Sequence, residues 1–579
     1  MKKFNFWFFS VIALITVMIF FSRADLNTNT YRDDKKYDGD LFFSRESGFY
    51  DQPFYLNLKT DKAEIYYTLD GSEPDKSSLK YTEPLYICDA TENDNVYSIR
   101  TDLSKFFYKD LTEFYLEHKK EAEIKDVIPD YAVPNYNVPK CTVIKAVTYD
   151  KSGNRGETLT ASYFVGEAQR PTSDDLITLV ISTSEDNLFD YEKGIYVTGK
   201  RFDDYLNDPE GYFSDPSEHD EFWDANYFGS GREWEKEANL QLFDGSEFIL
   251  SQQVGIRIQG GSSRELYPKS LNLYAREEYD GNSVIHLYQN MGICPDRLTV
   301  SNSGEDIYSK MKDPLVSDIC SDMDFVCMEY RPCVLYLNGE YWGYFFLTDR
   351  YGRKFLQQKY GVDDDNVIYV KAGVLQDGTD DDMERYLEEV SFIGNADMTV
   401  EENYKKAQEI MDIDSLIDYM AAEVYISRWN DWPSSNYALW RTRNPEDTRY
   451  GDCKWRFMLF DVNWGGLTYD DGDSTRDTLL LTRNESPLLG NMLNNPDFKR
   501  RFVDRLLSMR ENEFNPDKVS KKIDYYEDIM AVPIKEHYRR FFGTDASRFH
   551  EEAEKLKQFF RERYDYIPEM ITNNRLSQI

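Results

Sequence analysis

The spacing of apolar residues changes near Arg350, and this change limits the possible folds more than any other feature. Before it, apolar and polar residues alternate, as in "QQVGIRIQ" (252–259). After it, apolar residues recur at helical spacing, as in "IDSLIDYMAAEV" (413–424). Alternation is typical of strands with one buried face, and the helical period is typical of amphipathic helices. We therefore expect a β-rich front part and a helical back part, forming two lobes with a cleft between them.

The chain is too long for a single hydrophobic core, because 579 residues exceed the usual size of one domain. Residues 42–167 contain short alternating runs and tight-turn signals such as "LDGSEPD", which predict a small β-sandwich. A charged, tyrosine-rich insertion at about 88–140 interrupts it. We expect residues 168–579 to form a second α+β body, β-rich to about residue 349 and helical beyond. The sequence thus predicts a multidomain protein.

The N-terminus carries one long apolar run, residues 4–22, preceded by two lysines. The run is nearly long enough to span a bilayer, and the lysines favour a cytoplasmic N-terminus. The following "FFSRAD" is a poor cleavage site, so residues 1–25 are interpreted as an uncleaved signal anchor, with a cleaved signal peptide as the alternative. Residues 26–41 would be a polar tether. Either reading predicts an extracytoplasmic location, membrane-anchored through a single N-terminal transmembrane helix or secreted.

The charge of the chain restricts its partners. Lys and Arg number 68 against 105 Asp and Glu, which gives a formal net charge of −37. The acids are spread along the whole chain, and a surface of this kind repels nucleic acid and anionic lipid. We therefore expect no nucleic-acid partner. Any bound nucleotide would need local cations or a metal ion to overcome the repulsion.

Two acids and one carboxamide stand at the ends of apolar segments in the back part. "SRWNDWPSSNYALWR" places Asp431 five residues before Asn436, and the strand-like "KWRFMLFD" ends at Asp461. The order is helix, acid-x4-Asn loop, strand, strand, acid, as in the catalytic half of protein kinases. Phosphoryl transfer needs oxygen ligands that hold Mg²⁺ on the phosphates and an acceptor that orients the attacking hydroxyl. The alternative is that these residues only brace turns.

A phosphate chain also needs donors and cations. The turn "QGGSSR" (259–264) could present backbone N–H groups together with Ser262 and Ser263. Lys269 is the leading candidate for a lysine that grips phosphate, with Arg257 beside it. The alternative interpretation is an ordinary surface hairpin with charged flanks.

Other reaction classes find little support in the sequence. It holds no Walker-type G-x4-G-K-[ST], no H-E-x-x-H and no G-x-S-x-G, which disfavours P-loop NTPases, zinc peptidases and serine hydrolases. Seven cysteines form no C-x-x-C pair, which disfavours a structural zinc site and leaves disulfides open. The acidic segments "DGTDDD" and "YDDGDSTRD" do not fit an EF-hand loop and are interpreted as solvated loops.

The front domain resembles a known accessory module. "IYYTLDGSEPD" and "TVIKAVTYDKSGNRGE" are similar to the chitobiase/β-hexosaminidase C-terminal-type domain, which is immunoglobulin-like. That resemblance implies an accessory role at a cell surface, with polysaccharide contact through the β-sandwich. A simple spacer that lifts the next domain off the membrane is the alternative.

The larger body resembles the CotH-type (spore coat protein H) kinases. The similar segments, in order and spacing, are "GIRIQGGSSRELYPKSLNL", "VLYLNGEYWGYFFLTDRYGRKFL", "ISRWNDWPSSNYALWR" and "KWRFMLFDVNWG". The resemblance implies an atypical protein-kinase-like fold that transfers phosphate from ATP, with Mg²⁺ or Mn²⁺, to Ser/Thr acceptors of a coat protein. It also implies that Asp431 is the catalytic-loop acid and that Asn436 and Asp461 bind the metal.

Two positions depart from this family's pattern. Asn463 stands where a second acid is usual, and Asp349 stands where a Glu commonly ends the hairpin near the link between lobes. Both keep a polar oxygen, and Asp349 is retained as a candidate in the nucleotide site. The leading hypothesis is therefore an extracytoplasmic Ser/Thr protein kinase that acts on surface or coat proteins. The opposing hypothesis is a catalytically silent relative used for adhesion, glycan contact or envelope assembly.

Overall fold

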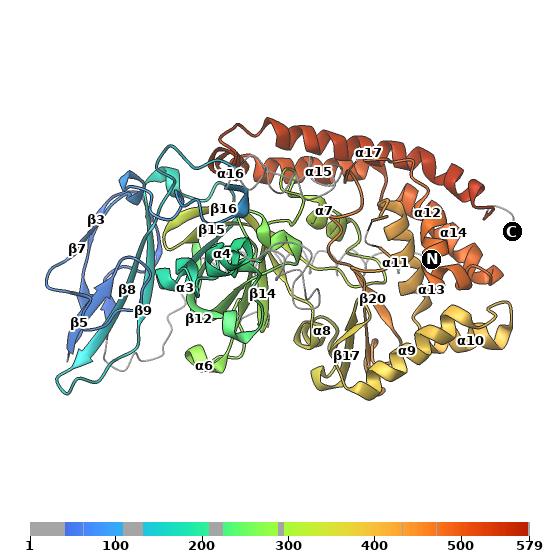
Figure 1. Cartoon of the computed structure of the whole chain (residues 1–579), viewed down its shortest axis with the longest axis horizontal. Helices are drawn as coiled ribbons and strands as arrows, with labels where there is room; N and C mark the ends of the chain where they lie inside the picture. The colour runs from blue at the N-terminus through green and yellow to red at the C-terminus, as the bar shows by residue number, and fades with distance from the viewer. Residues whose placement is uncertain are drawn as a thin grey trace, which may run out of the picture.

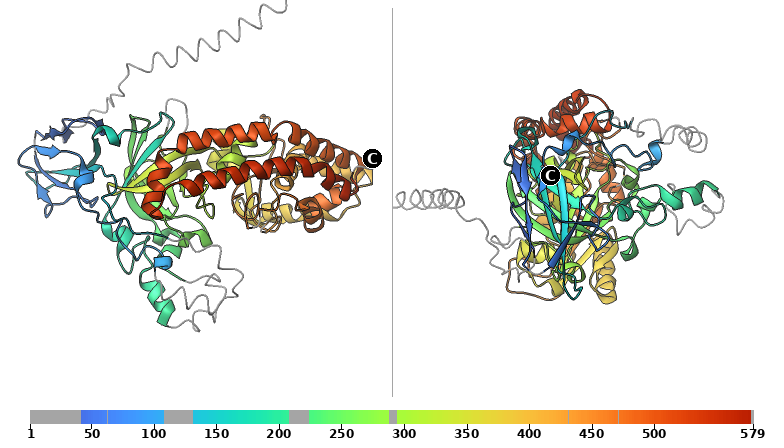
Figure 2. Two further views of the ribbon diagram at one scale, coloured as in Figure 1. Left: turned by 90° about the horizontal axis from the view of Figure 1, so that it is seen from above. Right: turned by 90° about the vertical axis from the view of Figure 1, so that its left-hand side faces the viewer.

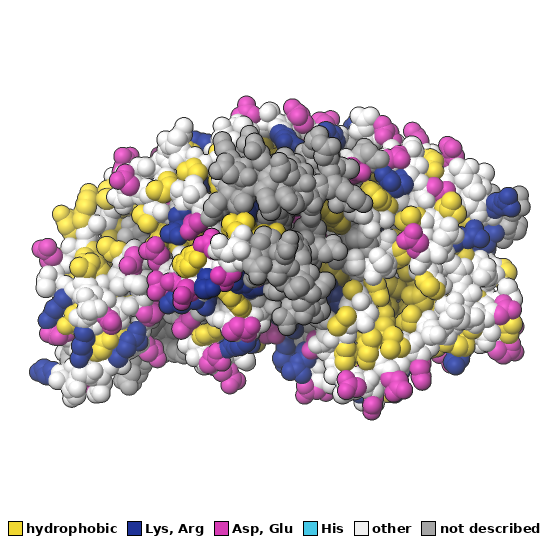
Figure 3. Space-filling model, in the orientation of Figure 1, with side chains coloured by type: hydrophobic (Ala, Val, Ile, Leu, Met, Phe, Trp, Pro, Cys, Tyr) yellow, Lys and Arg dark blue, Asp and Glu magenta, His cyan; other side chains and the backbone are white. Residues whose placement is uncertain are grey.

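The computed structural model describes residues 41–61, 63–107, 131–207, 224–287, 294–430, 432–470 and 472–576. The elongated molecule has a small β-sheet domain at one end and a mostly helical region at the other, with a β-barrel between them (Figures 1 and 2). Acidic side chains are scattered over the described surface in Figure 3, mixed with Lys and Arg. The segment interpreted as a membrane anchor lies outside the described residues. Within the described ranges no helix is long and apolar enough to cross a membrane.

The N-terminal domain is built around a five-stranded sheet in the order β2-β9-β8-β5-β6. Two short strand pairs, β1·β4 and β3·β7, complete it. The domain has one apolar core of its own, which includes Ile65, Ile144 and Tyr163. The strand bounds are β1 Phe42–Phe43, β2 Gly48–Tyr50, β3 Phe54–Leu56, β4 Leu58–Lys59, β5 Ala63–Thr68, β6 Leu79–Lys80, β7 Leu85–Ile87, β8 Thr142–Asp150 and β9 Leu159–Val165.

A closed seven-stranded barrel follows, in the order β10-β11-β12-β13-β14-β16-β15. All neighbours are antiparallel except β10 and β15, whose parallel pairing closes the barrel. The β15–β16 hairpin turns at Asn338-Gly339, where both residues have positive φ (48° and 88°), as the Asn-Gly pair predicts. The bounds are β10 Ile177–Ser182, β11 Lys236–Asp244, β12 Glu247–Ile258, β13 Leu271–Tyr274, β14 Arg297–Ser301, β15 Tyr330–Leu337 and β16 Glu340–Asp349.

The described part of the connection between β10 and β11, residues 183–207 and 224–235, contains the short α-helices α3 (Glu185–Phe189) and α4 (Gly199–Asn207). Residues 191–199, "YEKGIYVTG", alternate like a strand in the sequence but form turns here. Their apolar residues Ile195 and Val197 are buried beside the barrel core. Burial without strand pairing therefore explains the alternation, and a strand prediction for this segment is wrong.

The back part is not purely helical, because it contains an antiparallel sheet in the order β18-β17-β19-β20. α11 begins after Asp412, whose side chain accepts a hydrogen bond from Ser415 N–H as the N-cap, and its sides are buried. α15 and the long α17 lie together along the top of the molecule (Figures 1 and 2). The bounds are α6 Glu277–Asp280, α7 Lys312–Ile319, α8 Arg353–Tyr360, β17 Val367–Lys371, β18 Val374–Asp377, α9 Asp380–Asn395, α10 Glu401–Ile410, α11 Ile413–Tyr425, β19 Ala438–Thr442, β20 Arg456–Met458, α12 Thr478–Glu485, α13 Pro487–Met492, α14 Pro496–Glu511, α15 Pro516–Met530, α16 Pro533–Phe541 and α17 Ser547–Asn573.

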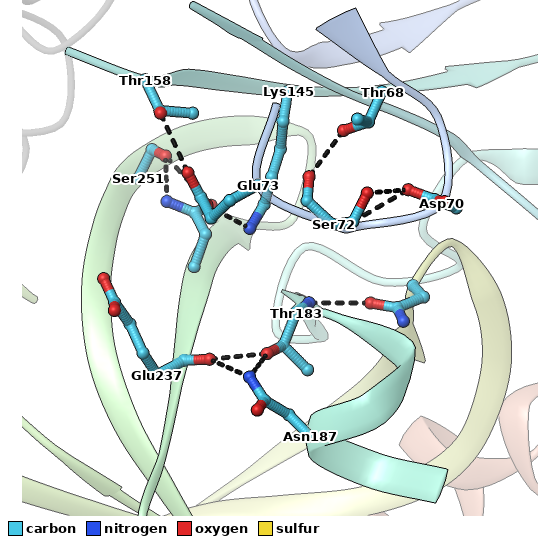
Figure 4. Close-up of polar contacts among 12 residues, drawn as sticks. Thr68, Asp70, Ser72, Glu73, Lys145, Thr158, Thr183, Asn187, Glu237 and Ser251 are labelled. Carbon is cyan, nitrogen blue, oxygen red and sulfur yellow. Dashed lines mark hydrogen bonds and ion pairs between the residues drawn. The ribbon is translucent and has the colours of Figure 1, made fainter. Parts of the chain in front are cut away.

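The N-terminal domain packs directly against the barrel. Phe164 of β9 contacts the barrel rings of Phe243 (5.7 Å between centroids) and Tyr336 (5.0 Å), and these residues share one core. Figure 4 shows polar groups along the same junction, where Glu73 accepts from Lys145 Nζ at 2.9 Å and from Thr158 Oγ1 at 2.9 Å. The shared core makes the domain an integral part of the molecule.

Candidate functional site

Helix α11 and strand β19 frame the predicted acid-x4-Asn loop. The helix ends at Tyr425 and the strand begins at Ala438, so the loop joins two buried elements. Asn436 is half-buried and adopts φ 51°, a left-handed conformation that Asn tolerates better than most residues. Asp431 lies outside the described residues, so its predicted catalytic role stays a prediction.

Asp461 follows β20 after a gap of two residues. The strand itself is only three residues long and pairs with β19. Asp461 is half-buried and has φ 56°, again in the left-handed region. Strained backbone of this kind is concentrated at functional sites, which makes the segment after β20 a candidate on structural grounds as well.

A carboxamide links Asp461 to a second acid that comes from far away in the sequence. Asn463 Nδ2 donates to Asp461 Oδ1 at 3.2 Å and to Asp313 Oδ2 at 2.7 Å. Asp313 is buried in the first turn of α7, and its Oδ1 accepts from Val462 N–H at 2.8 Å. Asn463 Oδ1 in turn accepts from the backbone N–H of Glu305 at 3.2 Å. We call Asp461, Asp313 and Glu305, with Asn463, the acid cluster.

The electrostatics of the acid cluster are those of like charges held together away from water. Burial, and then the charge of Asp461, raise the pKa of Asp313 to about 7. Burial raises the pKa of Glu305 to about 8, with contributions from the Glu265 and Asp461 carboxylates. Each shift means that the ionised form is disfavoured by its surroundings. A bound divalent cation would relieve this repulsion, and carboxylate and amide oxygens are the ligands that Mg²⁺ prefers.

One cation lies beside Asp461. Lys371 ends β17, and its Nζ sits 4.3 Å from the centre of the Phe460 ring. Burial lowers the pKa of Lys371, and the Asp461 carboxylate opposes that shift. Within the described ranges, no three His, Cys, Asp or Glu side chains gather closely enough to hold a metal ion. Asp431, which the sequence assigns to the same site, lies outside those ranges.

The predicted phosphate loop follows β12. Residues 260–265, the η7 loop, contain the short helix Ser262–Glu265, in which Ser262 is exposed and Ser263 half-buried. Arg264 spans the loop, because its Nε donates to Gly260 O at 2.6 Å and its Nη1 donates to Phe228 O at 2.8 Å. The backbone of this loop is therefore fixed by its own side chains.

Lys269 is buried, with no exposed surface, directly behind this loop. Its Nζ donates to Arg264 O at 2.6 Å and to Leu266 O at 3.2 Å, and lies 3.6 Å from the centre of the Tyr227 ring. Burial holds the pKa of Lys269 well below its usual range. The observed contacts are those of a residue that fixes the loop, and phosphate binding by Lys269 stays a prediction.

Arg257 and Asp349 lie on the barrel wall. Arg257 stacks over Tyr274 at 4.2 Å, donates from Nη1 to Gly231 O at 3.0 Å, and pairs with Glu235 at 3.6 Å. Asp349 ends β16, and burial together with the charge of Glu329 raises its pKa to about 6. Their assignment to a nucleotide site stays a prediction.

Sequence reasoning missed three members of the site: Asp313, Glu305 and Lys371. Asp313 carried a weak local signal, since an acid followed by proline is typical of the first turn of a helix. Glu305 lies in an irregular segment and carried none. Lys371 ends a strand that was not predicted, because the helical pattern after Arg350 concealed β17 and β18.

All seven cysteines, including Cys320, Cys327 and Cys333, are free thiols. Burial raises the pKa of the Cys327 thiol to about 12, which keeps it protonated and unreactive. The disulfide question that the sequence left open is therefore answered for this structure.

Two family models match the chain. The model described as "CotH kinase protein" matches residues 256–567, and the model described as "Fn3 associated" matches residues 54–163. No curated protein sequence matches the chain. The first match covers more than half of the 579 residues and includes the η7 loop, the acid cluster and the helical region. The second covers most of the N-terminal domain and confirms the resemblance noted in its sequence. The chain therefore belongs to the CotH kinase family, and it carries an Fn3-associated domain in front.

Proposed function

We propose that this chain is an ATP- and Mg²⁺-dependent Ser/Thr protein kinase that acts outside the cytoplasm on surface or coat proteins. Family membership supports kinase activity and a need for ATP. The observation that carries the proposal is the acid cluster, in which Asn463 joins Asp461 to the buried Asp313. In this proposal the barrel and the helical region act as the two lobes of an atypical protein-kinase-like domain.

The charge of Asp461 supports a metal-bound nucleotide, although the described carboxyl groups do not by themselves surround a metal ion. Asp461 contributes to the raised pKa of both Asp313 and Glu305, and a divalent cation at Asp461 would reduce that repulsion. Asp461 and Asn436 would hold Mg²⁺ or Mn²⁺, and the metal would neutralise developing charge on the phosphates. Asp313 and Asn463 fix the position of Asp461 through hydrogen bonds.

The remaining roles fall to residues around the cluster. Asp431 would accept the proton of the attacking Ser or Thr hydroxyl and orient its oxygen. Lys371 carries a positive charge next to Asp461 and would contact the phosphates. The η7 loop would offer backbone N–H groups, with Ser262 and Ser263 at its exposed side.

A binding role without turnover is the second candidate, and one observation favours it. Tyr55 of β3 and Tyr86 of β7 face each other across the strand pair, with ring centroids 5.2 Å apart. Both are well exposed, at 65% and 58%. Exposed aromatic pairs provide flat apolar surface for a ligand such as a sugar ring. An adhesion protein that contacts polysaccharide would use this pair, and its acid cluster would have no catalytic role.

The kinase proposal is tested by labelling. We expect the protein to transfer phosphate from labelled ATP to itself or to a serine-rich acceptor in the presence of Mg²⁺ or Mn²⁺. Asp461→Ala should abolish the transfer, because the metal loses its main ligand. Asp447→Ala is the matched control, since Asp447 is an exposed acid in the loop between β19 and β20. Equal labelling by wild type and Asp461→Ala would disprove the assignment of Asp461. Absence of ATP binding, with retention on polysaccharide, would favour the binding protein.

A further inference from the structure

The described ends of the insertion between β7 and β8 of the N-terminal domain, residues 88–107 and 131–141, lie against the barrel. The backbone N–H groups of Tyr97 and Ser98 donate to the Glu340 carboxylate at 3.2 and 2.8 Å. On the far side of the insertion, Tyr131 Oη accepts from the backbone N–H of Tyr267 at 3.0 Å. Both described ends of the insertion are thus attached to the barrel, one beside the β15–β16 turn and the other beside the η7 loop.

One lysine of this insertion reaches the η7 loop itself. Lys105 Nζ forms an ion pair with the carboxylate of Glu265, the last residue of the short helix in the loop. The two side chains are only 7% and 11% exposed. The neighbouring Ser104 Oγ donates to the backbone carbonyl of Glu265 at 2.9 Å. A domain that precedes the kinase segment therefore holds the loop by both the side chain and the main chain of one residue.

The same pair is electrostatically connected to the acid cluster. The Glu265 charge contributes to the raised pKa of Glu305, and Lys105 opposes that shift. Glu265 and Lys105 also act in opposite directions on the pKa of Lys269 behind the loop. Lys105 is thus the charge that balances Glu265 at the place where the η7 loop and the acid cluster meet.

Removal of Lys105 would leave the Glu265 carboxylate buried without its partner. An uncompensated buried charge is strongly unfavourable, so the carboxylate would take up a proton or move toward water. Movement of Glu265 displaces the short helix to which it belongs, and with it the backbone N–H groups of the η7 loop. These are the groups that the proposed function places against phosphate.

We propose that Lys105 is a positioning residue for nucleotide binding, so that the N-terminal domain completes the nucleotide site of the kinase segment. This inference rests on the proposed function. It assigns to the Fn3-associated domain a role inside the site, through a residue that lies outside the matched kinase segment.

The test compares three variants of the full chain. Lys105→Met removes the charge and keeps much of the length, and Lys105→Arg keeps the charge. Lys145→Met is the matched control, because Lys145 is a lysine of the same domain, 2% exposed, whose partner Glu73 lies 2.9 Å away at the junction of Figure 4. Three quantities are measured: the Kd for ATP with Mg²⁺ by calorimetry, amide hydrogen exchange of residues 258–268 without nucleotide, and the thermal midpoint.

We expect Lys105→Met to weaken ATP binding about tenfold and to speed exchange in residues 258–268, and Lys105→Arg to restore both to within about threefold of wild type. Lys145→Met should lower the thermal midpoint and leave ATP binding and the exchange of this segment unchanged. Wild-type ATP affinity and exchange in Lys105→Met would overturn the inference alone. Equal weakening by Lys105→Met and Lys145→Met would also overturn it. A wild-type protein that binds no ATP would overturn the proposed function, and the inference with it.

Discussion

The acid cluster gathers carboxyl groups, whereas the cations Arg264 and Lys269 lie in and directly behind the η7 loop, and the two regions differ in how these charges are paired. In the cluster, Asp313 and Glu305 stay close to Asp461 although burial and mutual repulsion raise the pKa of both. In the loop region, the cations are already bound: Lys269 to two carbonyls and Arg264 to Gly260 O and Phe228 O.

This difference indicates which charged groups stabilise the fold and which are available to a ligand or a reaction. A buried cation that donates to main-chain carbonyls satisfies acceptors that would otherwise be unpaired, so it stabilises the loop. Carboxyl groups that repel each other do not stabilise the fold, and proteins keep such arrangements where a cation or a reaction uses them. We therefore expect substitutions in the cluster to affect phosphate transfer most, and those around the loop to affect stability first.

The largest effect is expected from Asp313→Asn. The two carboxylate oxygens of Asp313 accept hydrogen bonds from Val462 N–H and from the Asn463 amide. An asparagine side chain has only one acceptor oxygen, so one of these two donors would face the new NH₂ group. We expect the free energy of unfolding to fall by only about 1 kcal/mol, because one buried donor is left unpaired while a carboxylate that Asp461 repels is removed. Labelling should fall about 100-fold, as is usual when a residue that orients a metal ligand is changed. Urea titration and labelling rates measure the two effects.

Asp318→Asn is the control for that experiment. Asp318 lies near the other end of α7 and forms a 40% exposed ion pair with Lys522. Its substitution should change the unfolding free energy by less than about 1 kcal/mol and leave labelling intact. Similar labelling by Asp313→Asn and Asp318→Asn would show that the acid cluster does not serve phosphate transfer. The proposed difference between the acid cluster and the η7 loop would then be wrong.

Lys269→Met should have the next largest effect. It distinguishes a lysine that fixes the η7 loop from a lysine that binds phosphate. Methionine fills a similar volume but leaves Arg264 O and Leu266 O without their donor. We expect the unfolding free energy to decrease by about 2 kcal/mol, seen as a lower urea midpoint. An unchanged midpoint together with lost ATP binding would instead make Lys269 a phosphate ligand, as its sequence position predicts.

Local features of the fold could be predicted from the sequence because their causes are local. Asn338-Gly339 turns the hairpin with two positive φ values, and Asp412 caps α11 with its own side chain. The closure of the barrel could not be predicted, since it needs the parallel pairing of β10 with β15, more than 140 residues later. The segment 191–199 was misleading, because burial alone produced an alternation like that of a strand.

In the candidate site, too, only residues with a local sequence signal could be predicted. Asp461 and Asn436 were found because each follows or precedes an apolar segment in a recognisable order. Asp313 was not found, because its link to Asn463 joins residues 150 positions apart. Lys105 could not be found either, since its partner Glu265 belongs to a different domain and is 160 positions away. Long-range pairs of this kind leave no periodic signal in the sequence.

The pH dependence of stability gives a third effect, through Glu305, that is measured as a slope and not as the loss of activity. Its pKa is raised to about 8 in the folded protein, so between about pH 4.5 and 8 the folded state holds a proton that the unfolded state has lost. The wild type should therefore lose stability as pH rises through this window, by up to about 1.4 kcal/mol per pH unit. Glu305→Gln should flatten the dependence and be relatively more stable at pH 8. Urea titrations at several pH values, with EDTA present, measure this. An identical slope in both proteins would remove Glu305 from the cluster.

The smallest expected effect concerns Arg257 and its neighbour Arg276, which share two partners. Both guanidinium groups lie over Tyr274, at 4.2 and 5.0 Å, and both pair with Glu235. Lysine cannot reproduce the planar stack or the fork, so Arg257→Lys and Arg276→Lys should each cost about 1 kcal/mol of stability. If Arg257 also serves the phosphates, only Arg257→Lys should raise the KM for ATP, by about threefold, since a lysine keeps the charge but not the geometry. Equal KM values in the two variants would place Arg257 with the residues that only support the barrel. In that case the η7 loop would contact the nucleotide through its main-chain N–H groups and not through Arg257. The cations around the loop would then only stabilise the fold, whereas the carboxyl groups of the acid cluster would serve phosphate transfer.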